Sequence, residues 1–237
     1  MITDLNDKIW ITGASSGIGR SMAISFANAG YKVFATARRK EKLELLSNEL
    51  REGAVVKSFP LDITDSKDVF SFAETTFGDD GIDCLINNAG ITSFSKIENN
   101  LVDDIEKIIQ TNLLGSIYAI KAVLPSMIMR KKGTIINILS VVTEKIFLQS
   151  GVYSASKAGL KAFALVLREE VRDKNIRVIN IYPGATETDI WSERSREKYA
   201  HRMMNPKDVA DFVLSVYEQT GNLVTEEIVL KPILGDL

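Results

Sequence analysis

Short apolar runs rich in β-branched residues alternate with longer segments of helical periodicity along the whole chain of 237 residues. This alternation is typical of a parallel sheet that is covered by helices on both faces. The sequence therefore predicts a doubly wound, Rossmann-type α/β fold with a seven-stranded parallel sheet. The expected strands are Lys8–Thr12, Lys32–Thr36, Val55–Pro60, Ile82–Ile86, Thr134–Leu139, Arg177–Tyr182 and Glu227–Leu230.

The segments between these runs carry apolar residues at helical spacing. Such spacing, together with capping residues, predicts helices over Ile18–Ala29, Asp65–Phe77, Leu113–Leu124, Leu160–Val171 and Pro206–Tyr217. No linker or repeat interrupts the pattern, so residues 1–237 are expected to form a single domain. The polar stretch 186–205 lacks periodicity and is expected to be a lid, a loop with one or two short helical turns.

Charge and cysteine content restrict the partners of the chain. Lys and Arg number 29 against 31 Asp and Glu, so no net positive field is available to hold a nucleic acid. The single cysteine, Cys84, excludes an intramolecular disulfide and a four-sulfur metal site, and is expected to be buried. The N-terminus is acidic where a signal peptide is basic, and no apolar run approaches the length of a membrane span. A cytoplasmic protein without a membrane or nucleic-acid partner is expected.

The first expected strand runs directly into the segment Thr12–Arg20, which contains Gly13, Gly17 and Gly19 and continues as a helix. Glycines allow a tight turn and a close approach of backbone amides to a phosphate, while the positive end of the helix dipole faces the anion. The spacing lacks the Gly-Lys-Ser or Gly-Lys-Thr of a nucleoside triphosphatase. The turn therefore predicts a pyrophosphate site, although a glycine-rich turn can also serve packing alone.

The residues after the second expected strand bear on which dinucleotide is bound. Enzymes that use NAD have an acidic residue there for the ribose 2′-hydroxyl, whereas this chain has Arg38 and Arg39. A guanidinium suits a 2′-phosphate, so NADP is preferred over NAD; Arg38, directly after the strand, is the stronger candidate. Asp62, which follows the third strand, either contacts adenine or caps the next helix.

Tyr153 and Lys157 lie four residues apart at the start of a long amphipathic helix, so their side chains share one face. A nearby ammonium is expected to lower the tyrosine pKa from its usual value of about 10, so that the phenol can transfer a proton near neutral pH. Ser140 follows the fifth strand, where its hydroxyl can bind a substrate oxygen. Asn112 lies among apolar residues of a helical pattern and needs buried partners. Taken singly, each residue also has an ordinary structural explanation.

These residues belong to an ordered series of motifs. The series is Thr12-Gly13-x-x-x-Gly17-x-Gly19, Asn87-Asn88-Ala89-Gly90, Asn112, Ser140, Tyr153-x-x-x-Lys157 and Pro183-Gly184-x-x-x-Thr188. Together these motifs strongly resemble the short-chain dehydrogenase/reductase family over essentially the whole chain. One departure is Leu139-Ser140 where many relatives carry Ser-Ser; we take Ser140, thirteen residues before Tyr153, as the catalytic serine.

The resemblance implies a role for each motif. Tyr153 would be the general acid/base, and Ser140 would position and polarise the carbonyl. Lys157 would bind the nicotinamide ribose and lower the tyrosine pKa, while Asn112 would hold a water in a proton relay. The residues expected at the dinucleotide are Gly13, Ser15, Ser16, Gly17, Ile18, Gly19, Arg38, Arg39, Asp62, Ile63, Asn88, Ala89, Gly90, Tyr153, Lys157, Pro183, Gly184, Thr186 and Thr188.

The resulting hypothesis is an NADP-dependent oxidoreductase that transfers a hydride between the nicotinamide and a carbonyl or secondary alcohol, without a metal ion. A non-catalytic NADP(H)-sensing protein is one alternative, but it has no need of the Tyr–Lys pair. An enoyl reductase is another, but a longer Tyr-to-Lys spacing is expected in that branch.

The substrate and the assembly are less constrained. Phe94, Ile146, Phe147 and Trp191 favour a partly hydrophobic small molecule without identifying it. The only histidine, His201, is expected to be exposed on the lid. The resemblance implies a homodimer or homotetramer formed through the helices that begin near Asn112 and Gly151.

Overall fold

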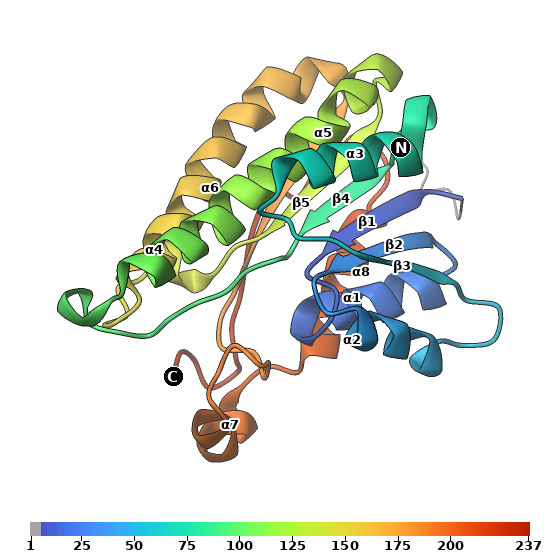
Figure 1. The fold of residues 1–237 in the computed structure, drawn as a ribbon. Coiled ribbons are helices and arrows are strands. Elements are labelled where there is room, and N and C mark those ends of the chain that lie inside the picture. The colour runs from blue at the N-terminus through green and yellow to red at the C-terminus, as the bar shows by residue number, and fades with distance from the viewer. Residues whose placement is uncertain (1–5) are drawn as a thin grey trace.

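The computed structural model describes residues 6–237, and within them one parallel sheet has the strand order β3-β2-β1-β4-β5-β6-β7 (Figure 1). The predicted fold class is confirmed, and each predicted strand lies within two residues of the observed one at either end. The strands are β1 (Lys8–Thr12), β2 (Lys32–Ala37), β3 (Val56–Pro60), β4 (Cys84–Asn87), β5 (Gly133–Ile138), β6 (Ile176–Pro183) and β7 (Glu227–Leu230).

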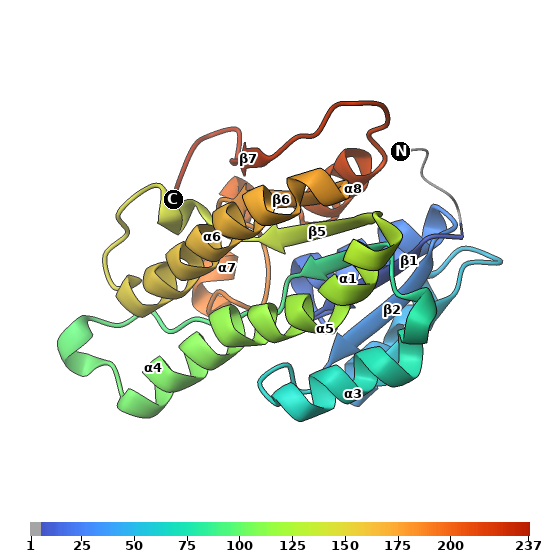
Figure 2. The ribbon, with the colours of Figure 1, turned by 90° about the horizontal axis from the view of Figure 1, so that it is seen from above.

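Helices cover both faces of the sheet, as Figure 2 shows from above. Apolar residues of α1 and α8 pack with one face, and those of α3, α5 and α6 pack with the other, where Trp10 is fully buried. The helices are α1 (Gly17–Asn28), α2 (Lys40–Glu44), α3 (Ser66–Phe77), α4 (Val102–Ile109), α5 (Gly115–Arg130), α6 (Gly151–Val171), α7 (Glu193–Tyr199) and α8 (Pro206–Tyr217).

The strand order reverses at β1, which pairs with β2 on one side and with β4 on the other. Ile11 and Ile86 are paired directly, so the carboxyl ends of β1 and β4 lie side by side. Open α/β sheets bind ligands in the crevice at such a reversal. The glycine turn after β1 and Asn88 after β4 therefore share one edge of the sheet.

The helical segment Val102–Arg130 spans 29 residues and is long and apolar enough, by length and composition, to cross a membrane. Such a segment was not expected, because the helical pattern in the sequence begins only at Leu113. In the fold, Ala119, Ile120 and Met127 of this segment are buried against the sheet. The segment is therefore the core helix of one layer.

A row of polar side chains, three buried asparagines and an exposed glutamate, crosses the sheet. Asn87, Asn137, Asn180 and Glu227 are aligned in register on four neighbouring strands. Each amide donates to the next side chain along the row, at 3.0 Å in all three cases. Arg168 of α6 donates to the Glu227 carboxylate at 2.6 Å, which compensates the charge at the end of the row.

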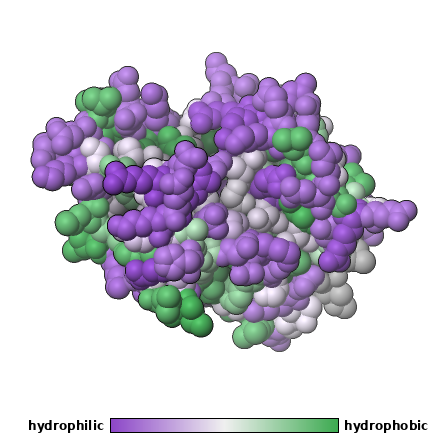
Figure 3. All heavy atoms as spheres, turned by 90° about the horizontal axis from the view of Figure 1, so that it is seen from below, coloured by the Kyte–Doolittle hydropathy of each residue, from purple (hydrophilic) through white to green (hydrophobic). Residues whose placement is uncertain are grey.

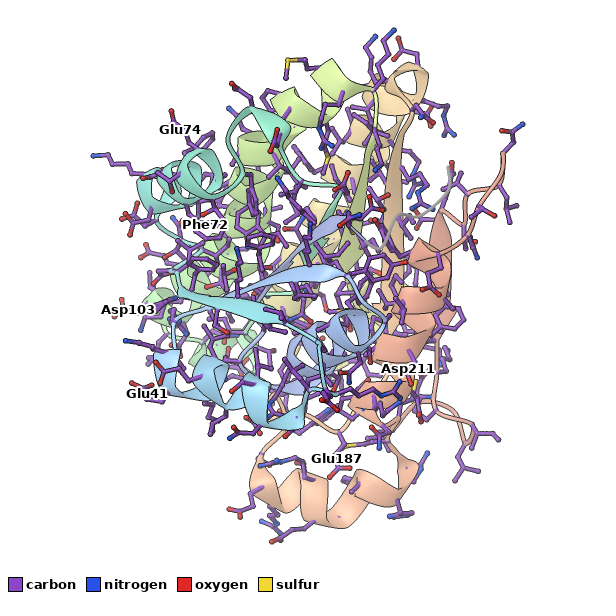
Figure 4. The ribbon with its side chains drawn as sticks, turned by 90° about the vertical axis from the view of Figure 1, so that its right-hand side faces the viewer. Glu41, Phe72, Glu74, Asp103, Glu187 and Asp211 are labelled. Carbon is purple, nitrogen blue, oxygen red and sulfur yellow. The ribbon has the colours of Figure 1, made fainter. Side chains whose placement is uncertain are left out.

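The segment 186–205 forms a protrusion at the carboxyl edge of the sheet, with α7 and the short helical turn Ala200–Arg202 within it. Its two ends are joined by backbone bonds, from Glu187 N to the Met204 carbonyl and from Met204 N to the Ala185 carbonyl. Figure 4 labels Glu187 next to α7 and Glu41 on α2. Figure 3 shows the molecule from below, with mostly hydrophilic side chains and separate apolar patches. We call residues 186–205 the lid.

Candidate active site

The glycine turn is packed so closely that side chains would not fit. Gly13 has a φ of +68°, and a Cβ there would lie 2.7 Å from the Cα of Ala89. A Cβ on Gly19 would collide with the side-chain amide of Asn88 and the Gly13 carbonyl. The turn thus brings its backbone against the chain that follows β4.

Asn88 holds this turn in place. Its side-chain amide donates to the backbone carbonyls of Thr12 and Gly13 at 3.0 and 3.2 Å. Its backbone N–H and that of Ala89 both donate to Thr12 Oγ1 at 3.1 Å. The Asn88 side chain is therefore engaged with the turn itself, and we expect it to act on a ligand by positioning the turn.

A hollow of about 430 Å³ lies beside the turn, at the N-terminus of α1. Its walls include Ser15, Ser16 and Gly17 from the turn and Thr188 from the lid. Gly17 has a φ of +55°, and a Cβ there would come within 2.9 Å of Thr188 Cγ2. Backbone amides at a helix N-terminus suit a phosphate, so this cradle fits the phosphates of a dinucleotide.

The two arginines after β2 behave differently. The guanidinium of Arg39 donates to Ser15 Oγ at 3.0 Å and to Ser16 Oγ at 2.8 Å, beside the hollow. Both arginines are exposed, and the contacts with the turn come from Arg39 rather than from Arg38, the stronger candidate by sequence. Strand β2 extends to Ala37, one residue beyond the expected end, and the residue that contacts the turn is Arg39.

The residues after β3 are partly engaged with the protein itself. Asp62 Oδ1 accepts from the backbone N–H and the hydroxyl of Thr64, at 2.9 and 2.8 Å, and so closes a local turn. The capping alternative for Asp62 is wrong, because Asp65 caps α3. Ile63 is buried, and a Cβ on Gly115 would lie 2.8 Å from its Cγ2. Its side chain is thus part of the core.

Tyr153 and Lys157 occupy the first turns of α6 and are almost fully buried, at 8% and 3% exposure. Lys157 Nζ lies 6.0 Å from the centroid of the Tyr153 ring and donates to the Ile138 carbonyl at 2.7 Å. Burial lowers the pKa of Lys157 to about 8. The pair therefore converges on one point, as their spacing in the helix predicts.

The pKa of Tyr153 departs from the expectation. Burial raises it to about 12, and the opposing influence is a hydrogen bond from Ser140. The predicted lowering of this pKa by Lys157 is therefore not observed in the structure. The physical reason is that desolvation of the phenolate outweighs the opposing influence of Ser140.

Ser140 lies two residues beyond the end of β5 and is buried. Its Oγ accepts from the backbone N–H of Val142 at 3.4 Å and acts on Tyr153 by lowering the pKa of the phenol, and its backbone carbonyl accepts from Thr143 Oγ1 at 2.9 Å. The serine and the tyrosine thus present two hydroxyls at one point of the carboxyl edge. Two hydroxyls so arranged can bind one substrate oxygen.

Asn112 lies in a π-helical turn, Gln110–Leu114, between α4 and α5. Its fully buried amide donates to the Ile91 carbonyl at 2.9 Å and to Ser156 Oγ at 3.0 Å, and its Oδ1 accepts from Ile91 N at 2.8 Å. Ser156 in turn donates to the Tyr153 carbonyl at 2.7 Å. Because the side chain is so engaged, a water held by Asn112 would bind its backbone carbonyl, which also accepts from Ser116.

The remaining expected residues lie around the same edge. Gly90 faces the lysine and the asparagine, since a Cβ there would lie 3.5 Å from Lys157 Nζ and 3.4 Å from Asn112 Oδ1. Gly184 N donates to the Leu230 carbonyl at 2.7 Å, and Thr186 Oγ1 donates to the Gly184 carbonyl at 3.1 Å. Ile18 and Pro183 lie at the start of α1 and the end of β6.

Sequence reasoning missed one residue and one contact. Ser156, which connects Asn112 to the start of α6, carries no motif of its own. The rings of Phe94 and Trp191 stack at 5.5 Å between centroids, joining the loop after β4 to the lid. Both aromatic residues are candidates by sequence, but their contact is not visible from spacing. His201 is exposed and Cys84 is buried, as expected.

Comparison with known proteins identifies the class. The sequence model of the short chain dehydrogenase family matches residues 7–199. An uncharacterized oxidoreductase of Staphylococcus aureus (strain MW2) is 34% identical over 239 residues, covering 98% of this chain and all of the relative. The chain therefore belongs to the short chain dehydrogenase family and is an oxidoreductase.

Solved structures agree with this classification. An alcohol dehydrogenase of the archaeon Thermococcus sibiricus, complexed with 5-hydroxy-NADP, has a TM-score of 0.85 at 25% identity, covering 96% of this chain and 97% of that protein. The closed form of a serine dehydrogenase complexed with NADP+ has a TM-score of 0.89 at 28% identity, covering 97% of this chain and 96% of that protein. The sheet and its helices are those of the family.

Proposed function

We propose that this oxidoreductase uses NADP to transfer a hydride between the nicotinamide and a carbonyl or secondary-alcohol carbon, with Tyr153 as general acid/base. The observation that carries the proposal is the buried group of Tyr153, Ser140 and Lys157 at the carboxyl edge of the sheet. The Arg39 guanidinium beside the glycine turn supports NADP over NAD. Structural neighbours complexed with NADP or an analogue add support.

The proton chemistry follows from the two hydroxyls. A bound nicotinamide supplies or takes up the hydride. The Ser140 hydroxyl donates to the substrate carbonyl oxygen, and Tyr153 gives its proton to the same oxygen as the alcohol forms. Burial raises the pKa of Tyr153 to about 12, so the phenol is protonated at neutral pH and ready to act as an acid. In the oxidative direction Tyr153 must first lose its proton, and the Ser140 hydrogen bond favours the phenolate.

Lys157 has a separate role in this proposal. Its pKa of about 8 keeps it mostly charged at neutral pH, and the Ile138 carbonyl fixes its position. Its remaining N–H groups can donate to the ribose hydroxyls next to the nicotinamide. Asn112 acts as a positioning residue, because its bonds reach Ile91 and, through Ser156, the backbone of Tyr153.

The test is NADPH oxidation over a panel of ketones, aldehydes and keto acids, with Tyr153→Phe and the control Tyr118→Phe. We expect Tyr153→Phe to lower kcat/KM by at least about 100-fold while NADPH affinity changes by less than about twofold. Tyr118→Phe, on α5, should retain activity. Robust turnover by Tyr153→Phe would exclude the assigned role. Tight NADPH binding without turnover of any carbonyl would favour the non-catalytic sensing protein.

We further propose a homodimer or homotetramer formed through α6 and the helical segment Val102–Arg130, which contains Asn112 and begins with α4. Leu101 and Val102 are exposed at the start of α4, and Leu165 and Val166 are exposed on α6. Apolar side chains on an outer helix face favour association. Light scattering coupled to size-exclusion chromatography measures the mass, and a monomer at micromolar concentration would contradict this proposal.

A further inference from the structure

One carboxylate connects the lid to α2 across the hollow beside the glycine turn. Asp189 belongs to the lid. Its Oδ2 lies 3.5 Å from Lys42 Nζ, and its Oδ1 lies 3.3 Å from Arg196 Nη1. Lys42 belongs to α2 and Arg196 to α7, and both line the hollow together with Asp189. The third cation of the lining, Arg20, is paired with Glu49 instead. A single anionic group is thus held between two cations at the expected phosphate site.

We propose that Lys42 and Arg196 bind a phosphate group of the dinucleotide, and that the Asp189 carboxylate competes with this phosphate for both cations. The inference rests on the proposed function, since it assigns further ligands to the same cofactor. It gives the lid a direct part in cofactor recognition, because Asp189 and Arg196 both belong to it.

The ion pairs of Asp189 are of a kind that an incoming phosphate can replace. The side chains of Lys42, Asp189 and Arg196 are 46%, 48% and 37% exposed. Ion pairs with this exposure contribute little, because solvent and salt screen them. A phosphate offers more charge than a carboxylate and a third oxygen, so it forms stronger bonds with a guanidinium and an ammonium.

One hydrogen-bond donor of Arg196 lacks a partner. Its Nε is buried and has no hydrogen-bond partner among the described residues. A buried N–H without an acceptor is unfavourable, so a movement of the Arg196 side chain that pairs this N–H with a phosphate would relieve the cost. Nη1 already points at Asp189, and a phosphate at that position can accept from Nη1 and from the adjacent Nη2 through two parallel bonds.

The hollow adjoins two expected phosphate positions. Ser15 and Ser16, which Arg39 contacts, lie where the 2′-phosphate is expected, and Gly17 lies where the pyrophosphate is expected. A second acid, Glu187, also lines the hollow and disfavours anions. The two cations must therefore supply the attraction, and the choice between the two phosphates is left to experiment.

The test measures the dissociation constants of NADPH and NADH by fluorescence titration of the full chain. Asp189→Asn should bind the recognised dinucleotide about threefold to tenfold more tightly, because it removes the competing charge. Lys42→Ala and Arg196→Ala should each weaken binding about fivefold or more, since each removes one charge-assisted contact. If the 2′-phosphate is the ligand, these changes are confined to NADPH; if the pyrophosphate is, they appear equally with NADH.

Matched controls separate local contacts from net charge. Glu193→Gln removes one negative charge from the first turn of α7, outside the lining of the hollow. Lys40→Ala removes one positive charge from α2, two residues before Lys42 and hence on a different side of the helix. Neither control should change either dissociation constant by more than about twofold. In the Lys42→Ala background, Asp189→Asn should tighten binding less than it does alone, because one of the contested cations is gone.

Two results would overturn the inference. One is that Asp189→Asn binds the dinucleotide with unchanged or weaker affinity. The other is that the dissociation constants of the control variants change as much as those of the variants they match. If either result is found while the wild type still binds NADPH and Tyr153→Phe still loses turnover, the role of the lid is rejected and the proposed function stands. A wild type that binds neither NADPH nor NADH rejects the proposed function itself.

Discussion

The ammonium of Lys157 donates a hydrogen bond to the backbone carbonyl of Ile138 at 2.7 Å. This bond ties the first turns of α6 to the end of β5, just before Ser140. The lysine is therefore fixed between the strand that leads to the serine and the helix that carries the tyrosine. Its burial has a measurable consequence for stability, because a charge in a dry site is costly.

The stability of the protein should depend on pH through Lys157. Burial lowers its folded pKa from the ordinary 10.5 to about 8, so between these values the unfolded chain binds more protons than the folded one. The free energy of unfolding contributed by Lys157 therefore rises with pH across this window. Relative to Lys157→Met, the wild type should gain up to about 3 kcal/mol between pH 8 and pH 10.5.

Urea denaturation of both proteins at several pH values measures this difference. Lys157→Met also loses the bond to Ile138, which lowers its free energy of unfolding by an amount that does not change with pH. The slope of the stability difference against pH is therefore the diagnostic quantity. A difference that stays constant or falls as pH rises would show that Lys157 titrates normally in the fold.

Cofactor preference should depend on Arg39 more than on Arg38. Both residues are exposed, but it is Arg39 that donates to Ser15 and Ser16 of the turn. Arg39→Asp should weaken NADPH binding about tenfold or more and leave NADH binding nearly unchanged, because a 2′-phosphate would meet a like charge. Arg38→Asp makes the same change of charge one residue away and should have a much smaller effect. Titration of both variants with NADPH and NADH measures these effects. Equal effects of the two variants would reject Arg39 as the residue that binds the 2′-phosphate.

The glycine turn offers a test of close packing. Gly13 and Gly53 both have positive φ values, +68° and +84°, but only at Gly13 would an added Cβ have other atoms within 4 Å. Gly53→Ala should therefore cost about 1 kcal/mol of stability from backbone conformation alone. Gly13→Ala should cost more and weaken NADPH binding at least about tenfold, since Ala89 or the turn must move. Thermal melts and NADPH titration measure both effects, and equal losses in the two variants would contradict the packing argument.

The sheet could be predicted because its strands are buried on both faces and read as apolar runs. The ends of these runs were less certain: β2 continues to Ala37, one residue beyond its expected end, and Arg39 rather than Arg38 contacts the turn. The helices with caps or long apolar stripes were also visible. Helix α4 was not predicted, and it joins α5 through the π-helical turn at Asn112.

Features that depend on burial or on distant contacts could not be predicted. The spacing of Tyr153 and Lys157 places both side chains on one face of the helix, but it does not indicate how deeply that face is buried. The raised pKa of Tyr153 thus required the structure. Likewise, Asp189 and Lys42 are far apart in sequence, and ordinary surface residues give no signal of their contact.

The row of asparagines could not be predicted either, because in the sequence each asparagine is an isolated polar residue inside an apolar strand. Only the register of β4, β5, β6 and β7 shows that Asn87, Asn137, Asn180 and Glu227 meet. Buried amides stabilise a fold only when they are satisfied, so the members of the row should differ in importance according to position.

Replacing Asn137 should therefore destabilise the protein more than replacing Asn87. Asn137→Leu leaves two buried atoms without partners, the Asn87 amide and Asn180 Oδ1. Asn87→Leu leaves one, Asn137 Oδ1, and also removes Asn87 Oδ1, which is buried without a partner among the described residues. At about 1–3 kcal/mol for each buried group left unpaired, we expect Asn137→Leu to cost about 2–5 kcal/mol and Asn87→Leu clearly less. Urea denaturation measures both, and an equal or larger loss in Asn87→Leu would show that packing rather than hydrogen bonding sets the stability of this row.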